Sequence, residues 1–208
     1  MQLYRTVWKR LIDIVLALIG LAVLLVPMLI FAIIIKLDSN GPVLFWQKRV
    51  GMNKKTFMMP KFRSMYTETP SEMPTHLLSD PSRWITPVGR VYRKFSIDEL
   101  PQIWCILTGE MSVIGPRPAL WNQFDLIEER DKYGANDVRP GLTGWAQING
   151  RDELEIPVKA KLDGEYVEKM SFLFDCKCFF GTILAVLRHD GVVEGGTGAG
   201  KQEKEQVQ

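Results

Sequence analysis

Two adjacent carboxylates, Asp98 and Glu99, are the residues of this 208-residue chain best suited to catalysis. They lie in the segment Ser96-Ile97-Asp98-Glu99-Leu100-Pro101, directly before an apolar stretch. Because proline is favoured in the first turn of a helix, Pro101 predicts that both carboxylates lie at a helix N-terminus. The free N–H groups there favour an ionised carboxylate and also a bound phosphate. An ionised Asp98 could attack phosphorus as a nucleophile, while Glu99 could bind Mg²⁺.

The same segment also has a purely structural interpretation. Ser96 and Glu99 have the spacing of a capping box, in which Glu99 would only accept a hydrogen bond from the Ser96 backbone. Taken alone, these few residues favour capping over catalysis.

Basic residues near the two carboxylates shift the balance towards a phosphate site. Arg117 lies between two prolines, which leave its backbone few conformations to lose on binding. Arginine also suits bidentate recognition of phosphate. The other candidate cations are Lys61 and Arg63 after a predicted hairpin, Arg90, Arg93 and Lys94 before the carboxylates, and Arg139 and Arg151 on glycine-containing loops.

Local patterns predict the elements that must position these side chains. The predicted elements are a β-hairpin of residues 43–50 and 56–59 around a turn at 51–54, a loop over 66–82, and helices over 96–108, 119–132 and 152–169. The second apolar stretch, Phe172 to Leu187, contains Asp175 and Lys177. It therefore predicts either a helix in a membrane interface or a helix packed in the core.

The first apolar stretch, Ile14 to Ile35, is a run of 22 residues without a charge. As a helix it would be about 33 Å long, enough to cross a bilayer core. Pro27 near its middle predicts a kink, and basic residues on both flanks favour two cytoplasmic ends. These residues leave two topologies open, a kinked crossing and a re-entrant hairpin.

Composition excludes several classes of protein. The net charge is +2 and 46% of the residues are hydrophobic, which argues against disorder and a generic nucleic-acid binder. The average hides a division, because residues 1–66 hold ten basic and two acidic residues and the remainder is net acidic. That asymmetry indicates a membrane surface or a phosphate-rich partner. The three cysteines predict free thiols, and His76 and His189 are expected at the surface.

Long motifs give the chain a specific resemblance. They are Gly41-Pro42-Val43, Gln47-Lys48-Arg49-Val50-Gly51, Lys61-Phe62-Arg63-Ser64-Met65, the segment from Arg93 to Gln102, Gly109-Glu110-Met111-Ser112, Gly115-Pro116-Arg117-Pro118, and the segment from Arg139 to Gln147. From Lys9 to about Gly191 the chain resembles the monotopic phosphoglycosyl transferases. These are bacterial sugar transferases that load a phospho-sugar onto a polyprenyl phosphate such as undecaprenyl phosphate.

The resemblance implies a two-step reaction. Asp98 would attack the β-phosphate of a UDP-sugar, so that UMP leaves and a phospho-sugar stays on the carboxylate. The polyprenyl phosphate would then take the phospho-sugar, which is the first membrane step in the assembly of an O-antigen, capsule, exopolysaccharide or glycoprotein glycan. The residues matching the family's site are Asp98 and Glu99 for catalysis and Mg²⁺, and Lys61, Arg93, Arg117 and Arg151 for the phosphates and nucleotide.

The resemblance also implies a fold and a location. We expect a mainly helical α+β protein with a β-hairpin, interfacial amphipathic helices and a re-entrant membrane helix broken at Pro27. The expected divisions are a membrane segment at 1–38, a catalytic domain at 39–190 and a polar tail at 191–208. The catalytic domain would lie on the cytoplasmic face of the bacterial inner membrane, against anionic lipid. Homo-oligomer formation is left open. Val26 replaces a serine found before the kink proline in small members, which affects the sharpness of the bend.

Two other classes of protein are compatible with the same residues. A membrane-anchored adaptor would use the basic surface without catalysis. A metal-assisted phosphotransferase would transfer the phospho-sugar directly, without a covalent intermediate.

Overall fold

A computed structural model describes residues 3–69, 80–150 and 154–188. In chain order the elements are a π-helical turn (Tyr4–Trp8), α1 (Lys9–Asp38), β1 (Leu44–Val50), a 3₁₀ turn (Met52–Lys54), β2 (Thr56–Phe62), α2 (Pro81–Trp84), α3 (Pro87–Lys94), the 3₁₀ helix η4 (Ile97–Gln102), α4 (Ile103–Thr108), β3 (Ser112–Ile114), α5 (Phe124–Asp131), β4 (Gly141–Thr143), α6 (Trp145–Ile148), α7 (Ile156–Lys169) and α8 (Phe172–Arg188). The predictions for His76, His189, Arg151 and the tail from residue 191 lie outside the described residues.

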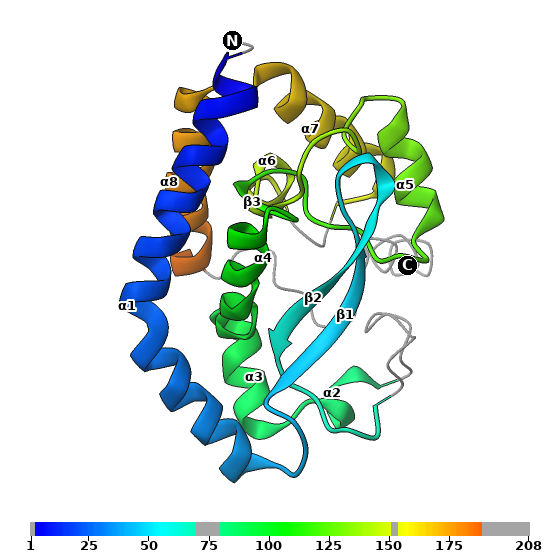
Figure 1. Cartoon of the computed structure of the whole chain (residues 1–208). Coiled ribbons are helices and arrows are strands. Elements are labelled where there is room, and N and C mark those ends of the chain that lie inside the picture. The colour runs from blue at the N-terminus through cyan, green and yellow to red at the C-terminus, as the bar shows by residue number, and fades with distance from the viewer. Residues whose placement is uncertain (1–2, 70–79, 151–153, 189–208) are drawn as a thin grey trace.

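The fold is mainly helical α+β with two small sheets, as the sequence predicts (Figure 1). Strands β1 and β2 form the predicted antiparallel hairpin, with Leu44 opposite Phe62 and Val50 opposite Thr56. Strands β3 and β4 pair in parallel, with Ser112 opposite Gly141. This second sheet was not predicted, because strands of three residues are too short to show an alternating pattern.

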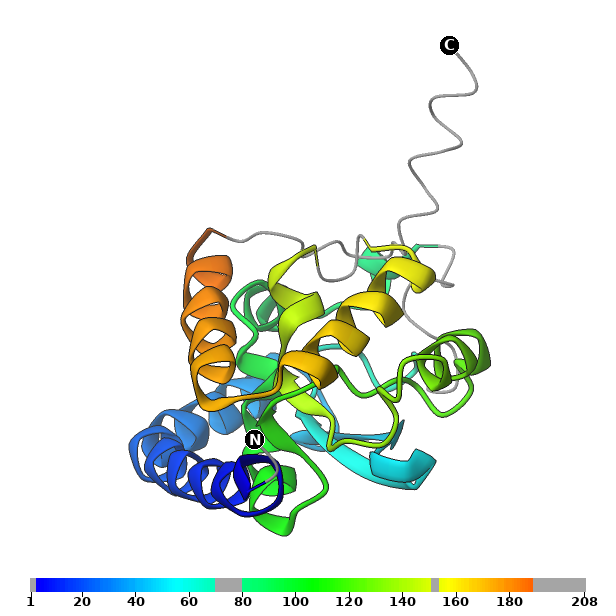
Figure 2. The same cartoon turned by 90° about the horizontal axis from the view of Figure 1, so that it is seen from above.

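Helix α1 is long and apolar enough to cross a membrane. It bends near its middle and lies along the outside of the domain (Figures 1 and 2). One face packs against the domain: Ala17 and Ile35 are buried, and Gly20 lies beside Ile103 of α4. The opposite face exposes apolar side chains, namely Leu16, Leu18, Ile19, Val23, Leu25, Val26, Leu29, Ile30, Ile33 and Ile34. Contact between this apolar face and water is unfavourable, so α1 favours an apolar environment on its outer side.

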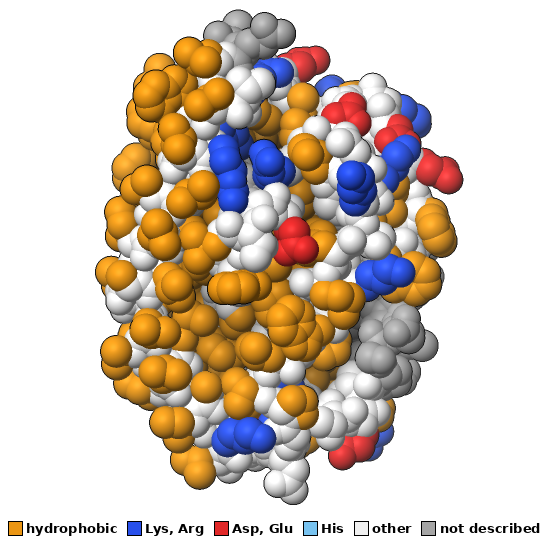
Figure 3. All heavy atoms as spheres, viewed as in Figure 1, with side chains coloured by type: hydrophobic (Ala, Val, Ile, Leu, Met, Phe, Trp, Pro, Cys, Tyr) orange, Lys and Arg blue, Asp and Glu red, His pale blue; other side chains and the backbone are white. Residues whose placement is uncertain are grey.

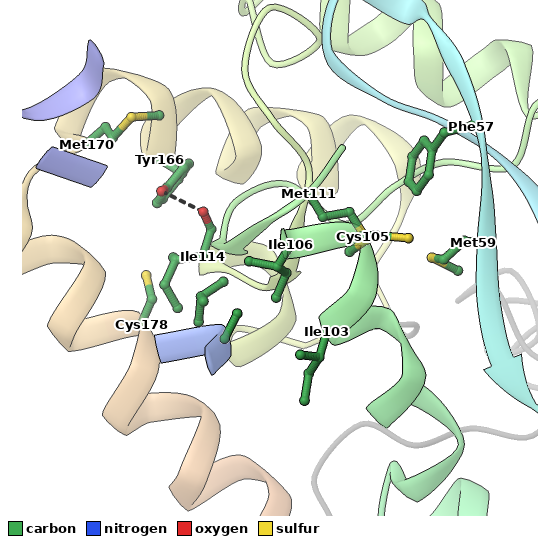
Figure 4. Packing of buried hydrophobic residues seen from close by; sticks show 12 residues of the cluster. Phe57, Met59, Ile103, Cys105, Ile106, Met111, Ile114, Tyr166, Met170 and Cys178 are labelled. Atoms are coloured by element: carbon green, nitrogen blue, oxygen red, sulfur yellow. Dashed lines mark hydrogen bonds between the residues drawn. The ribbon is translucent and has the colours of Figure 1, made fainter. Parts of the chain in front are cut away.

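The main core lies between α1, α4, α8 and the small parallel sheet (Figure 4). Ile106 of α4 and Met111 before β3 are almost completely buried there. Tyr166 of α7 is buried beside them and donates a hydrogen bond from its hydroxyl to the Ile114 carbonyl oxygen, at 3.0 Å. This bond satisfies the one polar group that the tyrosine brings into the core.

A buried polar network joins α1 to α8. Lys9 is 8% exposed, and its Nζ lies 2.7 Å from Oδ2 of Asp175. The Tyr4 hydroxyl also donates a hydrogen bond to Oδ2 of Asp175. The Tyr166 hydroxyl lies 2.8 Å from Oδ1 of Asp175 and shares its single proton between this oxygen and the Ile114 carbonyl. The Lys9 charge is therefore neutralised inside the protein. This network explains why the apolar helix α8 contains the charged residue Asp175.

We expect Asp175→Asn to lower the free energy of unfolding by about 3–5 kcal/mol, because Lys9 would stay buried without the carboxylate that it contacts. The change also replaces one of the two carboxylate oxygens that face Tyr4 and Tyr166 by an NH2 group, which cannot accept a hydrogen bond. The double variant Lys9→Met with Asp175→Asn should recover most of the loss. Thermal unfolding of the three proteins in detergent measures this, and equal midpoints for the wild type and Asp175→Asn would contradict a stabilising pair.

Two details of the helices differ from the predictions. The helix predicted over 119–132 begins only at Phe124, so Trp121 precedes it. Asp125 in its first turn accepts a hydrogen bond from the Leu126 N–H, and a carboxylate is favourable at this end of a helix. Helix α8 packs Cys178 in the core, as one of its two interpretations predicts, and exposes Leu173 and Phe180. All three cysteines are free thiols, as predicted.

Candidate functional site

Asp98 and Glu99 lie in the first turn of η4, where Pro101 predicts them. The capping box, in contrast, is wrong. Ser96 has a left-handed backbone (φ 55°) and its side chain caps no N–H group of the helix. Phe95 and Ser96 instead form the sharp turn that follows α3, and this turn directs the two carboxylates towards β2.

Glu99 is held by two cations from distant parts of the chain. Nζ of Lys61, on β2, lies 3.2 Å from Oε1 of Glu99. Arg117 binds the same carboxylate through both terminal nitrogens, with Nη1 3.2 Å from Oε2 and Nη2 donating to Oε1. This bidentate pairing fixes the guanidinium plane, so that the cluster is ordered before any ligand arrives.

Asp98 lies beside this pair and is 8% exposed. Burial raises the pKa of its carboxyl to about 6, against the opposing positive charges of Lys61, Arg93 and Arg117. Burial also lowers the pKa of the Lys61 ammonium, and Glu99 opposes that shift. Lys61 and Arg117 therefore hydrogen-bond to Glu99 while they act on Asp98 through charge. A carboxylate and an anionic phosphate repel each other. Cations around a desolvated carboxylate offset this repulsion, so the carboxylate can react with the phosphorus centre.

Strand pairing holds the loop that carries Arg117. The Gly115 N–H donates to the Thr143 carbonyl at 2.8 Å, and the Gly141 N–H donates to the Pro116 carbonyl at 2.9 Å. A Cβ on Gly141 would lie 2.1 Å from the Gly115 nitrogen, so only glycine allows this approach. The pairing brings two of the sequence motifs together across the parallel sheet.

Arg49 on β1 holds the other side of the same loop, and its role was missed from the sequence. Its Nη1 donates to the Pro118 carbonyl at 2.9 Å, and the N–H of Val50 donates to the Ala119 carbonyl. The only sequence signal for this role was the place of Arg49 in the motif Gln47-Lys48-Arg49. A motif does not show which group the side chain contacts.

The cations predicted near the carboxylates divide into two groups. Lys61, Arg93 and Arg117 lie close enough to Asp98 to lower the pKa of its carboxyl. Arg63 is instead structural, because its guanidinium donates to the carbonyls of Ser39, Asn40 and Pro42 and closes the turn after α1. Arg139 donates to the Gly109 carbonyl.

The two carboxylates fit Mg²⁺ but not a cage made of protein alone. Among the described residues, no group of three or more His, Cys, Asp or Glu side chains could enclose a metal ion. Mg²⁺ commonly takes one or two carboxylates and completes its shell with water and substrate phosphates. The adjacent Asp98 and Glu99 match that pattern.

An apolar surface adjoins the site. Orange side chains cover α1 and continue over α3 and α4 (Figure 3). Val91 and Phe95 are about half exposed, and Trp104, two residues after η4, is 60% exposed. Trp104 and the carboxylates therefore belong to one continuous helical segment, Ile97 to Thr108, which carries both the charged cluster and part of this apolar surface.

Most of the chain matches a known protein family. The family described as "Bacterial sugar transferase" matches residues 4–189. A sugar transferase of Bacillus subtilis, EpsL, is 40% identical over 88% of this chain and 89% of its own length. An undecaprenyl-phosphate glucose phosphotransferase of Komagataeibacter xylinus is 42% identical over 84% of this chain. An undecaprenyl-phosphate N-acetylgalactosaminephosphotransferase of Aeromonas hydrophila is 38% identical over 86%. The match spans 35% and 43%, respectively, of the last two proteins.

Proposed function

Because this chain belongs to the bacterial sugar transferase family and is a phosphoglycosyl transferase, we propose that it moves a sugar-1-phosphate from a UDP-sugar to undecaprenyl phosphate. The observation that carries the proposal is the arrangement around Asp98, a buried carboxylate among three cations whose neighbour Glu99 pairs with Lys61 and Arg117. Relatives named for glucose and for N-acetylgalactosamine show that the family uses both kinds of sugar. The sugar of this enzyme is therefore left to experiment.

In the proposed reaction an Asp98 oxygen attacks the β-phosphorus of the donor. The new bond joins phosphorus to the carboxylate, and the bond to the bridging oxygen breaks, so that UMP leaves with the electron pair. An oxygen of undecaprenyl phosphate then attacks the same phosphorus, and the bond to Asp98 breaks and restores the carboxylate. Asp98 must be ionised to attack in the first step, and it leaves as the carboxylate in the second.

The neighbouring residues orient and neutralise the phosphates. Lys61, Arg93 and Arg117 surround Asp98 with positive charge, which offsets repulsion between the carboxylate and the diphosphate. Arg151 stays a prediction for the same role. Asp98 and Glu99 would hold Mg²⁺, which when bound would supply charge neutralisation of the leaving phosphate.

The proposed topology is re-entrant, with both ends of α1 on the cytoplasmic face. At its start Lys9 pairs with Asp175, and at its end Arg63 binds the carbonyl of Ser39. Because both ends are attached to one domain, a straight crossing would require one attachment to break. Pro27, which has no N–H to donate within the helix, lowers the cost of the bend. The exposed faces of α1 and α8 would then contact lipid.

Cysteine labelling in whole cells tests this topology. Leu3→Cys and Asn40→Cys, each in a Cys176→Ser background, should resist an impermeant maleimide in intact cells and react after permeabilisation. Labelling of either position from outside would contradict a re-entrant helix.

The donor step should depend on pH through Asp98. Its pKa is raised to about 6, so the reactive carboxylate is lost as the pH falls through that value. We expect the single-turnover rate of UMP formation, measured without the lipid acceptor, to fall about tenfold per pH unit below pH 6. Leaving out undecaprenyl phosphate removes the titration of its own phosphate. A rate that stays flat from pH 5 to pH 8, with the protein still folded, would contradict the assignment.

The direct test is UMP release over a panel of UDP-sugars with undecaprenyl phosphate and Mg²⁺. One or more sugars should support release and yield a lipid-linked diphospho-sugar. Mass spectrometry after donor alone should show a phospho-sugar on Asp98. Turnover without that adduct would favour direct transfer, and silence from every sugar would favour the adaptor.

A further inference from the structure

Helix α1 carries a buried carboxylate, Asp13, directly before its uncharged run. Asp13 is 3% exposed, and its Oδ1 accepts two hydrogen bonds from β3. One comes from the Ser112 hydroxyl at 3.0 Å, and the other comes from the Val113 N–H at 2.9 Å. A buried backbone N–H without a partner is unfavourable, so the carboxylate satisfies a donor that would otherwise cost stability.

Strand β3 is held along both of its edges. On the side of β4, the Ser112 N–H donates to the Pro140 carbonyl at 2.8 Å. Successive N–H groups of a strand point to opposite edges, so the Val113 N–H points away from β4 and towards α1. Asp13 therefore fixes this three-residue strand at the edge that β4 leaves open.

The position of β3 sets the position of Arg117. Arg117 lies three residues after Ile114, the last residue of β3, and its guanidinium binds the Glu99 carboxylate through two nitrogens. Prolines on both sides of Arg117 restrict the backbone between the strand and the arginine, so a displacement of β3 also displaces the guanidinium. Asp13 thus supports one half of the carboxylate cluster.

The first turns of α1 also hold the other half. Helix α1 lies beside both α4 and β3 (Figure 1). Arg10, one turn before Asp13, donates to the carbonyls of Ile106 and Leu107 in α4, which directly follows η4 and its two carboxylates. Residues three apart lie on the same face of a helix, so one face of α1 binds both segments that form the cluster.

We infer that Asp13 is a positioning residue for the proposed transfer reaction, because it holds β3 where Arg117 can meet Glu99. It acts through its two hydrogen bonds to the strand and is not itself a catalytic residue. The inference rests on the proposed function, since it concerns the geometry of the same site. Helix α1 is then part of the scaffold of the active site as well as an anchor.

The variants Asp13→Ala and Asp13→Asn test this role. Alanine removes both acceptors, so the single-turnover rate of UMP formation at saturating donor should fall about tenfold or more, because a small displacement of a positioned group slows a reaction strongly. Asparagine keeps an oxygen that can accept both bonds, so its rate should stay within about threefold of the wild type. Ser112→Ala removes one bond and should lower the rate about threefold, which keeps the test open if Asp13→Ala does not fold.

Asp163→Asn is the matched control. Asp163 is also a buried carboxylate, 1% exposed, but it pairs with Arg130 and so joins α7 to α5. This variant should melt at a lower temperature than the wild type, while its rate, measured well below the melting midpoint, should stay within about twofold. A loss of stability alone would therefore not reproduce the effect expected of Asp13→Ala.

Hydrogen exchange reports on the strand itself and requires no turnover. In Asp13→Ala the peptide over residues 112–117 should exchange faster than in the wild type, and Asp13→Asn should restore its protection. Unchanged exchange, an unchanged rate in Asp13→Ala and Ser112→Ala, or an Asp13→Asn variant as slow as Asp13→Ala would each overturn the inference. If the wild type releases no UMP from any UDP-sugar, the proposed function fails, and exchange still shows whether Asp13 holds β3.

Discussion

Asp98→Asn should abolish turnover while leaving a folded and more stable protein. The amide is a poor nucleophile, so we expect UMP release to fall by about 10³-fold or more. No phospho-sugar adduct should form on residue 98. The measurements are UMP release and intact-protein mass spectrometry after incubation with donor.

Stability provides the control for this variant. The folded protein raises the pKa of Asp98 above its ordinary value, so the native state binds its proton more tightly than the unfolded chain does. Ionised Asp98 therefore destabilises the fold, and this cost develops as the pH rises from about 4 to about 6. Asp98→Asn should be more stable than the wild type at pH 8, by up to about 3 kcal/mol, and equal to it near pH 4.

Two results would remove Asp98 from the mechanism. One is residual activity within tenfold of the wild type. The other is a variant that melts earlier than the wild type at pH 8, because lost activity would then report misfolding.

Glu99→Gln should have the second largest effect, a loss of about a hundredfold or more in kcat/KM. The change keeps the shape of the side chain but removes the charge that pairs with Lys61 and with Arg117. Both cations lose their counter-charge, and the pKa of Lys61, already lowered by burial, should fall further. The arginine also loses one acceptor of its bidentate contact.

The magnesium dependence gives this variant a second readout. If Glu99 helps to hold the ion, Glu99→Gln should require a higher Mg²⁺ concentration for half-maximal rate. Glu129→Gln is the matched control, since Glu129 also accepts from a lysine, Lys132, but at the surface of α5. That control should stay within about twofold of the wild type. An unchanged rate and an unchanged Mg²⁺ titration in Glu99→Gln would rule out both roles.

Membership of this family explains why the chain exposes so many apolar side chains. Undecaprenyl phosphate stays in the bilayer, so an enzyme that uses it must bring its site to the lipid surface. Trp104 is exposed on α4, which directly follows the segment that carries Asp98 and packs against α1. The basic N-terminal third contributes less surface charge than its composition predicts, because Lys9 and Arg63 are used inside the fold.

Local signals in the sequence determined much of this protein. The uncharged run of α1, the hairpin and the position of Pro101 each depend on neighbouring residues, so they were predictable from the order of residues alone. The two carboxylates at the start of η4 followed from the same kind of signal.

Only the tertiary structure decided which groups meet. Arg117 reaches Glu99 because β3 pairs with β4, and that pairing joins residues almost thirty positions apart through strands too short to show periodicity. Arg63 is also an arginine within a motif, yet it binds backbone carbonyls, because the packing of α1 brings the turn that follows that helix to its guanidinium. Burial and partners are properties of the folded chain, whereas the sequence shows only which groups are present.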